Sequence, residues 1–100
     1  MILMTLNCQG LTSFPKKLEV KRLIEQQSLD IIFIRETMCD GVDLVKDMEL
    51  LLKGWLFISV DAKGKSGGLL IGWRSRNFLR MNAWAMHSGL CATLHSIELQ

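Results

Sequence analysis

The sequence predicts an α+β protein in which a mixed β-sheet carries two helices on one of its faces. Three observations support this class. The first half of the chain alternates apolar runs with amphipathic segments, in the order strand, helix, strand, helix. The second half then contains four β-like runs separated by turn formers. The length of 100 residues, of which 49% are hydrophobic, fits one small domain and excludes a disordered chain.

The first half predicts a strand–helix–strand unit. Residues 2–6 form a short apolar run that ends at turn formers, which is typical of a buried strand. A helix is expected over residues 15–27, because apolar side chains recur there at near-helical spacing and Pro15 stands near its start. Residues 30–35 are apolar and β-branched in the middle, which indicates a strand buried on both faces, as in a parallel sheet. We therefore expect the two strands to run in parallel.

The next segment predicts a second helix and a β-hairpin. Apolar side chains recur at helical spacing over residues 42–52, and Gly54 ends this helix. Residues 55–60 and 69–73 are expected to form two strands joined by the turn 61–68. Because a turn of this length joins neighbouring strands, the two runs should pair in antiparallel fashion.

Two more strands complete the predicted architecture. They are expected over residues 78–86 and 91–99, with a turn at residues 87–89 between them. The sequence contains no repeat, linker or low-complexity segment, so residues 1–100 are interpreted as part or all of one domain.

Charge and cysteine usage bound the class of protein. The formal net charge of +2 is too small to indicate nucleic-acid or membrane binding by itself. Cys8, Cys39 and Cys91 are an odd number without the spacing of a zinc site, which favours a reducing compartment. The amino terminus does not resemble a signal peptide, and no apolar run approaches the roughly 18 residues of a membrane span. We expect an intracellular protein, nuclear or cytoplasmic, with no membrane partner.

Two polar residues follow the two predicted parallel strands. Asn7 follows the first strand and Glu36 the second, so both should lie at one edge of the sheet, where α/β proteins gather ligands. A carboxylate there can coordinate a hard cation such as Mg²⁺, and an amide can bond a phosphate oxygen or a water molecule. The alternative is that Asn7 caps a turn and Glu36 is a solvated loop acid.

Three segments carry a resemblance to a known family. They are LNCQGL at residues 6–11, LDIIFIRET at residues 29–37 and VDAKGKSGGLLIGW at residues 60–73. In order and spacing they resemble the opening of an endonuclease/exonuclease/phosphatase domain. Within that superfamily they are most similar to the endonuclease domains of plant non-LTR (LINE-type) retroelements, and the likeness extends over nearly the whole chain.

The resemblance implies a fold and a chemistry. The fold would be half of a four-layer α/β sandwich of the DNase I-like type. The activity would be Mg²⁺-dependent cleavage of DNA, in which an activated water attacks a phosphodiester. Glu36 would be the metal-binding and catalytic glutamate. Asn7 would be the catalytic asparagine that orients phosphate and water at the same centre, and with Glu36 it would bind the metal.

The sequence also departs from the family's pattern. Arg35 stands where the family has glutamine and Met38 where it has lysine, and an arginine beside Glu36 could pair with it. The family's further acidic residues and its terminal Asp–His pair come after the end of this sequence, and neither His87 nor His95 corresponds to that histidine. One carboxylate and one amide are too few protein ligands to assemble the family's Mg²⁺ centre, so residues 1–100 are expected to be the N-terminal portion of such a domain, truncated or decayed, and inactive alone.

A second hypothesis assigns the chain to a non-catalytic module that binds nucleic acid or protein. Arg74, Arg76 and Arg80, together with Lys63 and Lys65, would then form a basic rim for a polynucleotide backbone. Charged edge strands that prevent aggregation are the alternative explanation. A phosphatase acting on phosphoinositides, or a nuclease acting on RNA tails, also stays open within the same superfamily.

The expected truncation makes a further prediction about the sheet. If a second sheet is missing, apolar side chains of residues 31–34 and 69–71 should form an exposed patch on one face. Self-association through that exposed sheet face is the expected result.

Overall fold

The computed structural model describes residues 1–60, 67–86 and 89–96, with side-chain placement over 1–60 and 67–76. These ranges contain six strands, two helices and one short 3-10 turn. In chain order they are β1 (Leu3–Asn7), α1 (Phe14–Gln26), β2 (Ile31–Arg35), α2 (Gly41–Leu51), β3 (Trp55–Val60), β4 (Leu69–Arg74), the 3-10 turn Ser75–Asn77, β5 (Phe78–Met86) and β6 (Gly89–Ser96). The predicted α+β class and order of elements are confirmed.

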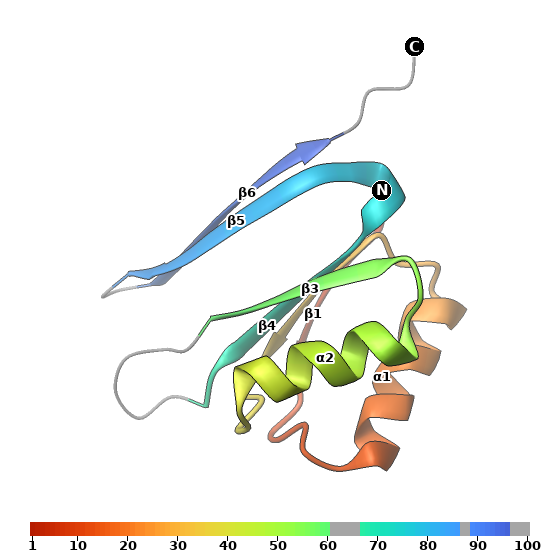
Figure 1. The fold of residues 1–100 in the computed structure, drawn as a ribbon, viewed down its shortest axis with the longest axis vertical. Helices are drawn as coiled ribbons and strands as arrows, with labels where there is room; N and C mark the ends of the chain where they lie inside the picture. Colours follow the sequence, from red (N-terminus) through yellow and green to blue (C-terminus); the bar gives the residue numbers. More distant parts are fainter. Residues whose placement is uncertain (61–66, 87–88, 97–100) are drawn as a thin grey trace.

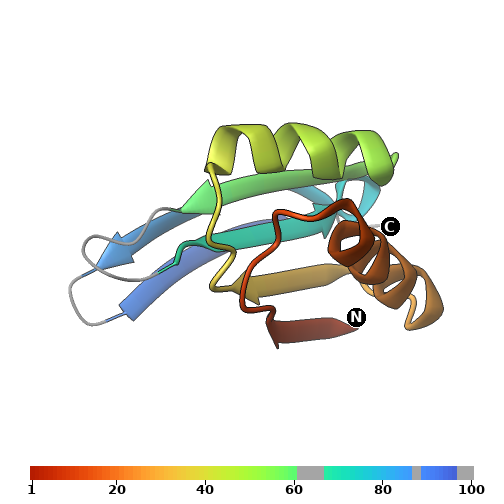
Figure 2. The same cartoon turned by 90° about the horizontal axis from the view of Figure 1, so that it is seen from below.

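Four strands form the mixed sheet, in the order β1-β2-β4-β3. β1 pairs with β2 in parallel, whereas β4 pairs in antiparallel fashion with both β2 and β3. Figure 2 shows β1 at one edge of the sheet, beside β2. The predicted hairpin is therefore formed by β3 and β4, and its second strand lies next to the strand–helix–strand unit.

Each helix begins at a polar cap. The Ser13 hydroxyl accepts a hydrogen bond from the Lys16 backbone N–H at 3.3 Å, and Asp40 accepts from the backbone N–H of Val42 at 2.9 Å. These caps satisfy backbone donors that have no partner within the helix. Neither α1 nor α2 has the length and apolar character needed to cross a bilayer.

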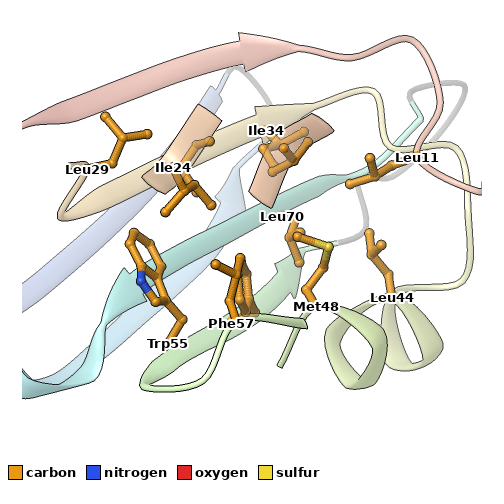
Figure 3. Packing of buried hydrophobic residues seen from close by; sticks show 12 residues of the cluster. Leu11, Ile24, Leu29, Ile34, Leu44, Met48, Trp55, Phe57 and Leu70 are labelled. Atoms are coloured by element: carbon orange, nitrogen blue, oxygen red, sulfur yellow. The ribbon is translucent and has the colours of Figure 1, made fainter. Parts of the chain in front are cut away.

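The main core lies between the two helices and one face of the sheet (Figures 1 and 3). Both helices contribute to a single cluster, α1 through Ile24 and α2 through Met48. The sheet contributes Ile34 and Leu70, which are fully buried. Since both helices pack on the same cluster, they cover the same face, as the sequence predicts.

The opposite face of the sheet carries a smaller apolar cluster. Its central residues Ile31, Ile71 and Trp73 are at most 6% exposed. β5 and β6 form a separate two-stranded antiparallel sheet, which lies on the side of the four-stranded sheet away from the helices (Figure 1).

The exposed apolar patch expected at residues 31–34 and 69–71 is not formed, because Ile31 and Ile71 are buried, whereas self-association itself stays a prediction. On that face Ile31, Ile71 and Trp73 are buried within a single chain, and Phe33 and Leu69 are partly buried against them. The physical reason is that β4 leads through the short 3-10 turn directly into β5, which returns over the sheet and contacts β3.

Candidate functional site

The carboxyl ends of β1 and β2 lie side by side at one edge of the sheet. In the parallel register, Asn7 is the partner of Arg35, the residue before Glu36. Backbone hydrogen bonds extend this ladder past the strand ends, from Cys8 N–H to Arg35 O at 3.2 Å, from Gly10 N–H to Glu36 O at 2.7 Å and from Leu11 N–H to Thr37 O at 2.7 Å. The structure therefore brings the segments that carry Asn7 and Glu36 together.

Glu36 is half-buried at this edge. Its carboxylate makes no hydrogen bond or ion pair with any residue in the described ranges, and neither does the exposed side chain of Arg35. The suspected Arg35–Glu36 pair is thus not formed there. Burial raises the pKa of the nearby Cys8 thiol, and the Glu36 carboxylate contributes to raising it. The backbone of Glu36 lies beside the end of β1, since its carbonyl oxygen accepts from Gly10 N–H.

Asn7 is exposed and forms a local turn. Its side-chain oxygen Oδ1 accepts a hydrogen bond from the Gln9 backbone N–H at 3.3 Å. Such a bond is typical of an Asx-turn, so the turn-capping interpretation of Asn7 is confirmed. The Asn7 amide nitrogen has no partner among the described residues. Capping consequently leaves two N–H donors for a ligand such as a phosphate oxygen.

Two glycines of the loop before β4 support the segment that carries Glu36. The Glu36 backbone N–H donates to Gly68 O at 2.9 Å. The Thr37 hydroxyl, buried behind it, donates to Gly67 O at 3.1 Å. Sequence reasoning did not assign these contacts, although Thr37, Gly67 and Gly68 all stand in the motifs that carry the family resemblance. The presence of these residues in the family-like motifs was the one feature of the sequence that could have pointed to a supporting role.

A cavity of about 280 Å³ opens between the end of β1 and α1. It is lined by Leu6, Asn7, Cys8, Leu11, Lys16, Glu19, Val20 and Leu23. Lys16 donates from Nζ to the backbone oxygen of Cys8 at 2.6 Å, which places a cation one residue from Asn7. No sequence motif singled out Lys16, because on α1 it belongs to an ordinary alternation of charged and apolar residues.

The predicted basic rim lies elsewhere. In the antiparallel register of β2 and β4, Leu69 pairs with Arg35, whereas Trp73 pairs with Ile31 at the far end. Arg74 and the following 3-10 turn therefore lie at the opposite end of the strands from Glu36. At about 3.4 Å per residue, the five residue steps from Leu69 to Arg74 separate them by roughly 17 Å or more.

Arg74 is held by contacts within the fold. Its guanidinium donates to Leu29 O at 2.8 Å, lies 3.8 Å from the Asp30 carboxylate and stacks 5.4 Å from the centre of the Trp55 ring. Arg76 is exposed on the 3-10 turn. Arg80 lies on β5, and its side chain falls outside the described placement, as do Lys63 and Lys65 of the 61–66 segment.

The donor set at this edge can be tested against the cation that the resemblance implies. The described residues contain no group of three or more histidine, cysteine, aspartate or glutamate side chains that could hold a metal ion. Glu36 supplies one carboxylate that has no partner within the described ranges, and Mg²⁺ is commonly held by one or two carboxylates while it keeps several waters. The residues present therefore fit a largely hydrated Mg²⁺ with Glu36 as its carboxylate ligand.

Comparison with solved structures places this fold among DNase I-like proteins. The AP endonuclease LMAP from Leishmania major aligns with a TM-score of 0.58 at 18% identity, over 79% of this chain and 26% of that protein. An endonuclease/exonuclease/phosphatase family protein from Bacteroides thetaiotaomicron aligns with a TM-score of 0.53 at 16% identity, over 79% of this chain and 32% of that protein. No protein-family model and no curated protein matches the sequence.

These likenesses define the fold and its extent. The four-stranded mixed sheet with two helices is part of the DNase I-like fold of endonuclease/exonuclease/phosphatase proteins, as the sequence predicts. The chain spans about a quarter to a third of the length of these two structures. An identity below one fifth supports the architecture, whereas activity has to be argued from the residues at the site.

Proposed function

We propose that this chain provides one side of the active site of a Mg²⁺-dependent phosphodiesterase that nicks DNA. The observation that carries the proposal is the meeting of two strand ends, where the exposed amide of Asn7 and the carboxylate of Glu36, which is unpaired among the described residues, stand on adjacent segments. Ligands of open α/β sheets gather at such carboxyl ends of parallel strands. The DNase I-like neighbours support the same reaction class at the level of fold.

Each residue has a separate task in this proposal. Glu36 would hold the hydrated Mg²⁺, which when bound stabilises negative charge on the phosphate or on the leaving oxygen. Asn7 would donate from its amide nitrogen to a phosphate oxygen while its Oδ1 stays in the turn with Gln9. Lys16, held against Cys8 O, adds positive charge at the same edge for a polyanionic substrate.

The finer assignment rests on the sequence motifs. The sequence motifs at residues 6–11, 29–37 and 60–73 support an endonuclease of retroelement (LINE) type, acting in the nucleus or cytoplasm. By the same resemblance, the remaining acids and the Asp–His pair come from segments that these 100 residues do not include. We therefore propose that the 100-residue chain binds cation and phosphodiester but does not cleave alone, since the residues whose side chains the structure describes place no general base beside Glu36.

The proposal is tested by nuclear magnetic resonance on the 15N-labelled chain. A short DNA duplex is added with and without Mg²⁺, and shifts of backbone amides and of the Asn7 side-chain amide are followed. We expect Mg²⁺-dependent shifts of the Asn7 and Glu36 signals in the wild type and their loss in Glu36→Gln. Shifts that are the same with and without Mg²⁺, and the same in the wild type and in Glu36→Gln, would contradict the proposal.

A plasmid-nicking assay with Mg²⁺ complements this test. We expect no nicking by the isolated chain; nicking by the wild type that disappears in Glu36→Ala would overturn that expectation while supporting the role of Glu36. Binding that depends on salt, is centred on Arg76 and is unchanged in Glu36→Ala would instead identify a non-catalytic nucleic-acid-binding module. The fixed position of Arg74, whose guanidinium is already engaged by Leu29 and Trp55, weighs against that alternative.

A further inference from the structure

The backbone at Glu36 has an uncommon conformation. Glu36 and Met38 have φ angles of 57° and 55°, in the left-handed region that residues other than glycine seldom adopt. Gln9, in the neighbouring segment of the same edge, has φ of 50°. Such conformations cost free energy and persist only where surrounding contacts determine them. The contacts that determine the conformation of Glu36 are therefore of functional interest.

Those contacts come from the two glycines that precede β4. The Glu36 N–H donates to Gly68 O at 2.9 Å, and the N–H of Met38 donates to Gly67 O. Thr37, which lies between them and is 3% exposed, adds a hydroxyl bond to Gly67 O at 3.1 Å. The Thr37 N–H also donates to Gly68 O at 3.4 Å, so residues 36–38 are held by four bonds to one short segment.

Neither glycine has room for a side chain without disturbing this segment. Gly68 has φ of 86°, and a Cβ there would lie 3.0 Å from the Thr37 hydroxyl oxygen. A Cβ on Gly67 would lie 3.3 Å from the Glu36 Cα and 2.7 Å from Cγ of Met38. Since φ near +86° disfavours L-residues, substitution of Gly68 would be strained even apart from this contact.

We infer that Thr37, Gly67 and Gly68 are positioning residues that hold Glu36 in its left-handed conformation and so aim its carboxylate at the edge shared with Asn7. The inference rests on the proposed function, because a metal-binding carboxylate needs a fixed backbone. Supporting contacts of this kind orient metal ligands, and their loss commonly lowers metal affinity by about 10- to 100-fold.

The first readout of this inference needs no metal. A left-handed residue has a short distance between its amide proton and its own Hα, and therefore a strong cross-peak between them in NOE spectra. We expect this cross-peak for Glu36 in the wild type and in Thr37→Ser, which keeps the hydroxyl. It should weaken in Thr37→Val, which keeps the volume but not the hydroxyl, and in Gly68→Ala. Thr5→Val, an exposed threonine on β1, is the matched control and should leave it unchanged.

The second readout is the Mn²⁺ concentration that half-broadens the Glu36 amide signal, with Mn²⁺ as a paramagnetic substitute for Mg²⁺. It should rise about tenfold in Thr37→Val and Gly68→Ala and return to the wild-type value in Thr37→Ser. Thermal unfolding followed by circular dichroism identifies any variant that fails to fold. If Gly68→Ala does not fold, Thr37→Val alone tests the positioning role.

The outcomes separate the two proposals. An unchanged Glu36 cross-peak in folded Thr37→Val overturns the positioning inference, whatever the metal does. If Mn²⁺ does not broaden the Glu36 amide signal of the wild type, the proposed function is overturned. The Glu36 cross-peaks then still test whether Thr37 and Gly68 hold the left-handed conformation. A Mn²⁺ response lost in Glu36→Gln but unchanged in Thr37→Val supports the function and contradicts the positioning role.

Discussion

The ring of Phe57 on β3 covers Gly72, its cross-strand partner on β4. A Cβ on Gly72 would lie 2.3 Å from Cε1 of the ring, so no larger residue fits beneath it as the sheet stands. Phe57 itself is 6% exposed and belongs to the core that the helices cover (Figure 3). The sheet that carries the candidate site therefore depends on a glycine in the middle of a strand.

Gly72→Ala should lower the free energy of unfolding by roughly 1–3 kcal/mol, the usual cost of overpacking a core. Urea unfolding measures this change. Because Phe57→Leu removes the ring atoms that the new methyl meets, the double variant should lose less stability than the sum of the two single variants. Strictly additive losses would show that the ring does not set the requirement for glycine.

Asp40 should contribute to stability through the cap of α2. Its side-chain oxygen accepts from the N–H groups of Val42 and Asp43, so Asp40→Ala should cost about 1 kcal/mol in urea unfolding. Asn is an equally favoured cap, and Asp40→Asn should therefore retain most of the stability. Equal losses in the two variants would mean that the cap bond contributes little.

Arg74 and Arg76 should differ sharply although they are two residues apart. Arg74→Ala removes a charged donor from Leu29 O and a contact with the Trp55 ring, and we expect a loss of about 2 kcal/mol of unfolding free energy. Arg76→Ala alters an exposed side chain and should change stability by less than about 0.5 kcal/mol. Similar effects of the two substitutions in urea unfolding would contradict the assigned structural role of Arg74.

The thiols of Cys8 and Cys39 should ionise at a higher pH in the folded chain than in the denatured chain. Burial raises the pKa of each above its ordinary value of 9.0, so at pH 8 both should react more slowly with iodoacetamide than in the denatured chain. Peptide mass spectrometry resolves the two sites. Alkylation as fast in the folded as in the denatured chain would contradict the burial of these sulfurs.

The same shifts predict how stability depends on pH. A raised pKa in the folded state means that the folded chain retains thiol protons that the unfolded chain loses first. This contribution is complete below pH 9.0 and declines as the pH rises through 9.0 toward the folded values. The chain has no tyrosine to titrate in that range. The decline should be smaller in the Cys8→Ser, Cys39→Ser double variant, and an identical alkaline profile would refute the linkage.

Local patterns in the sequence predicted the elements well. The strands expected at residues 55–60 and 78–86 have those bounds in the structure, and the helix expected from residue 15 begins one residue earlier, after the Ser13 cap. The meeting of the Asn7 and Glu36 segments was also predictable, because a strand–helix–strand unit with parallel strands places both carboxyl ends at one edge.

Long-range contacts limited the prediction of the site. The separation of Arg74 from Glu36 follows from the antiparallel register of β4 on β2. The left-handed conformation of Glu36 follows from bonds to Gly68, thirty-two residues away in the sequence, and no local pattern marks it. The burial of Ile71 depends on where β5 returns after the 3-10 turn, whereas the prediction of an exposed face assumed that truncation leaves the sheet without a second sheet to cover it.

The most direct test of the central claim is a residue-resolved titration of the 15N-labelled chain with Mn²⁺. The account predicts that amide signals of residues 7–10 and 35–37 broaden together, at a lower Mn²⁺ concentration than the rest of the chain. Glu36→Gln should abolish this joint response, and Glu25→Gln, which alters an exposed acid on α1, should preserve it. Broadening of only one of the two segments, or the same response in Glu36→Gln, would contradict a shared cation and phosphodiester site at these strand ends.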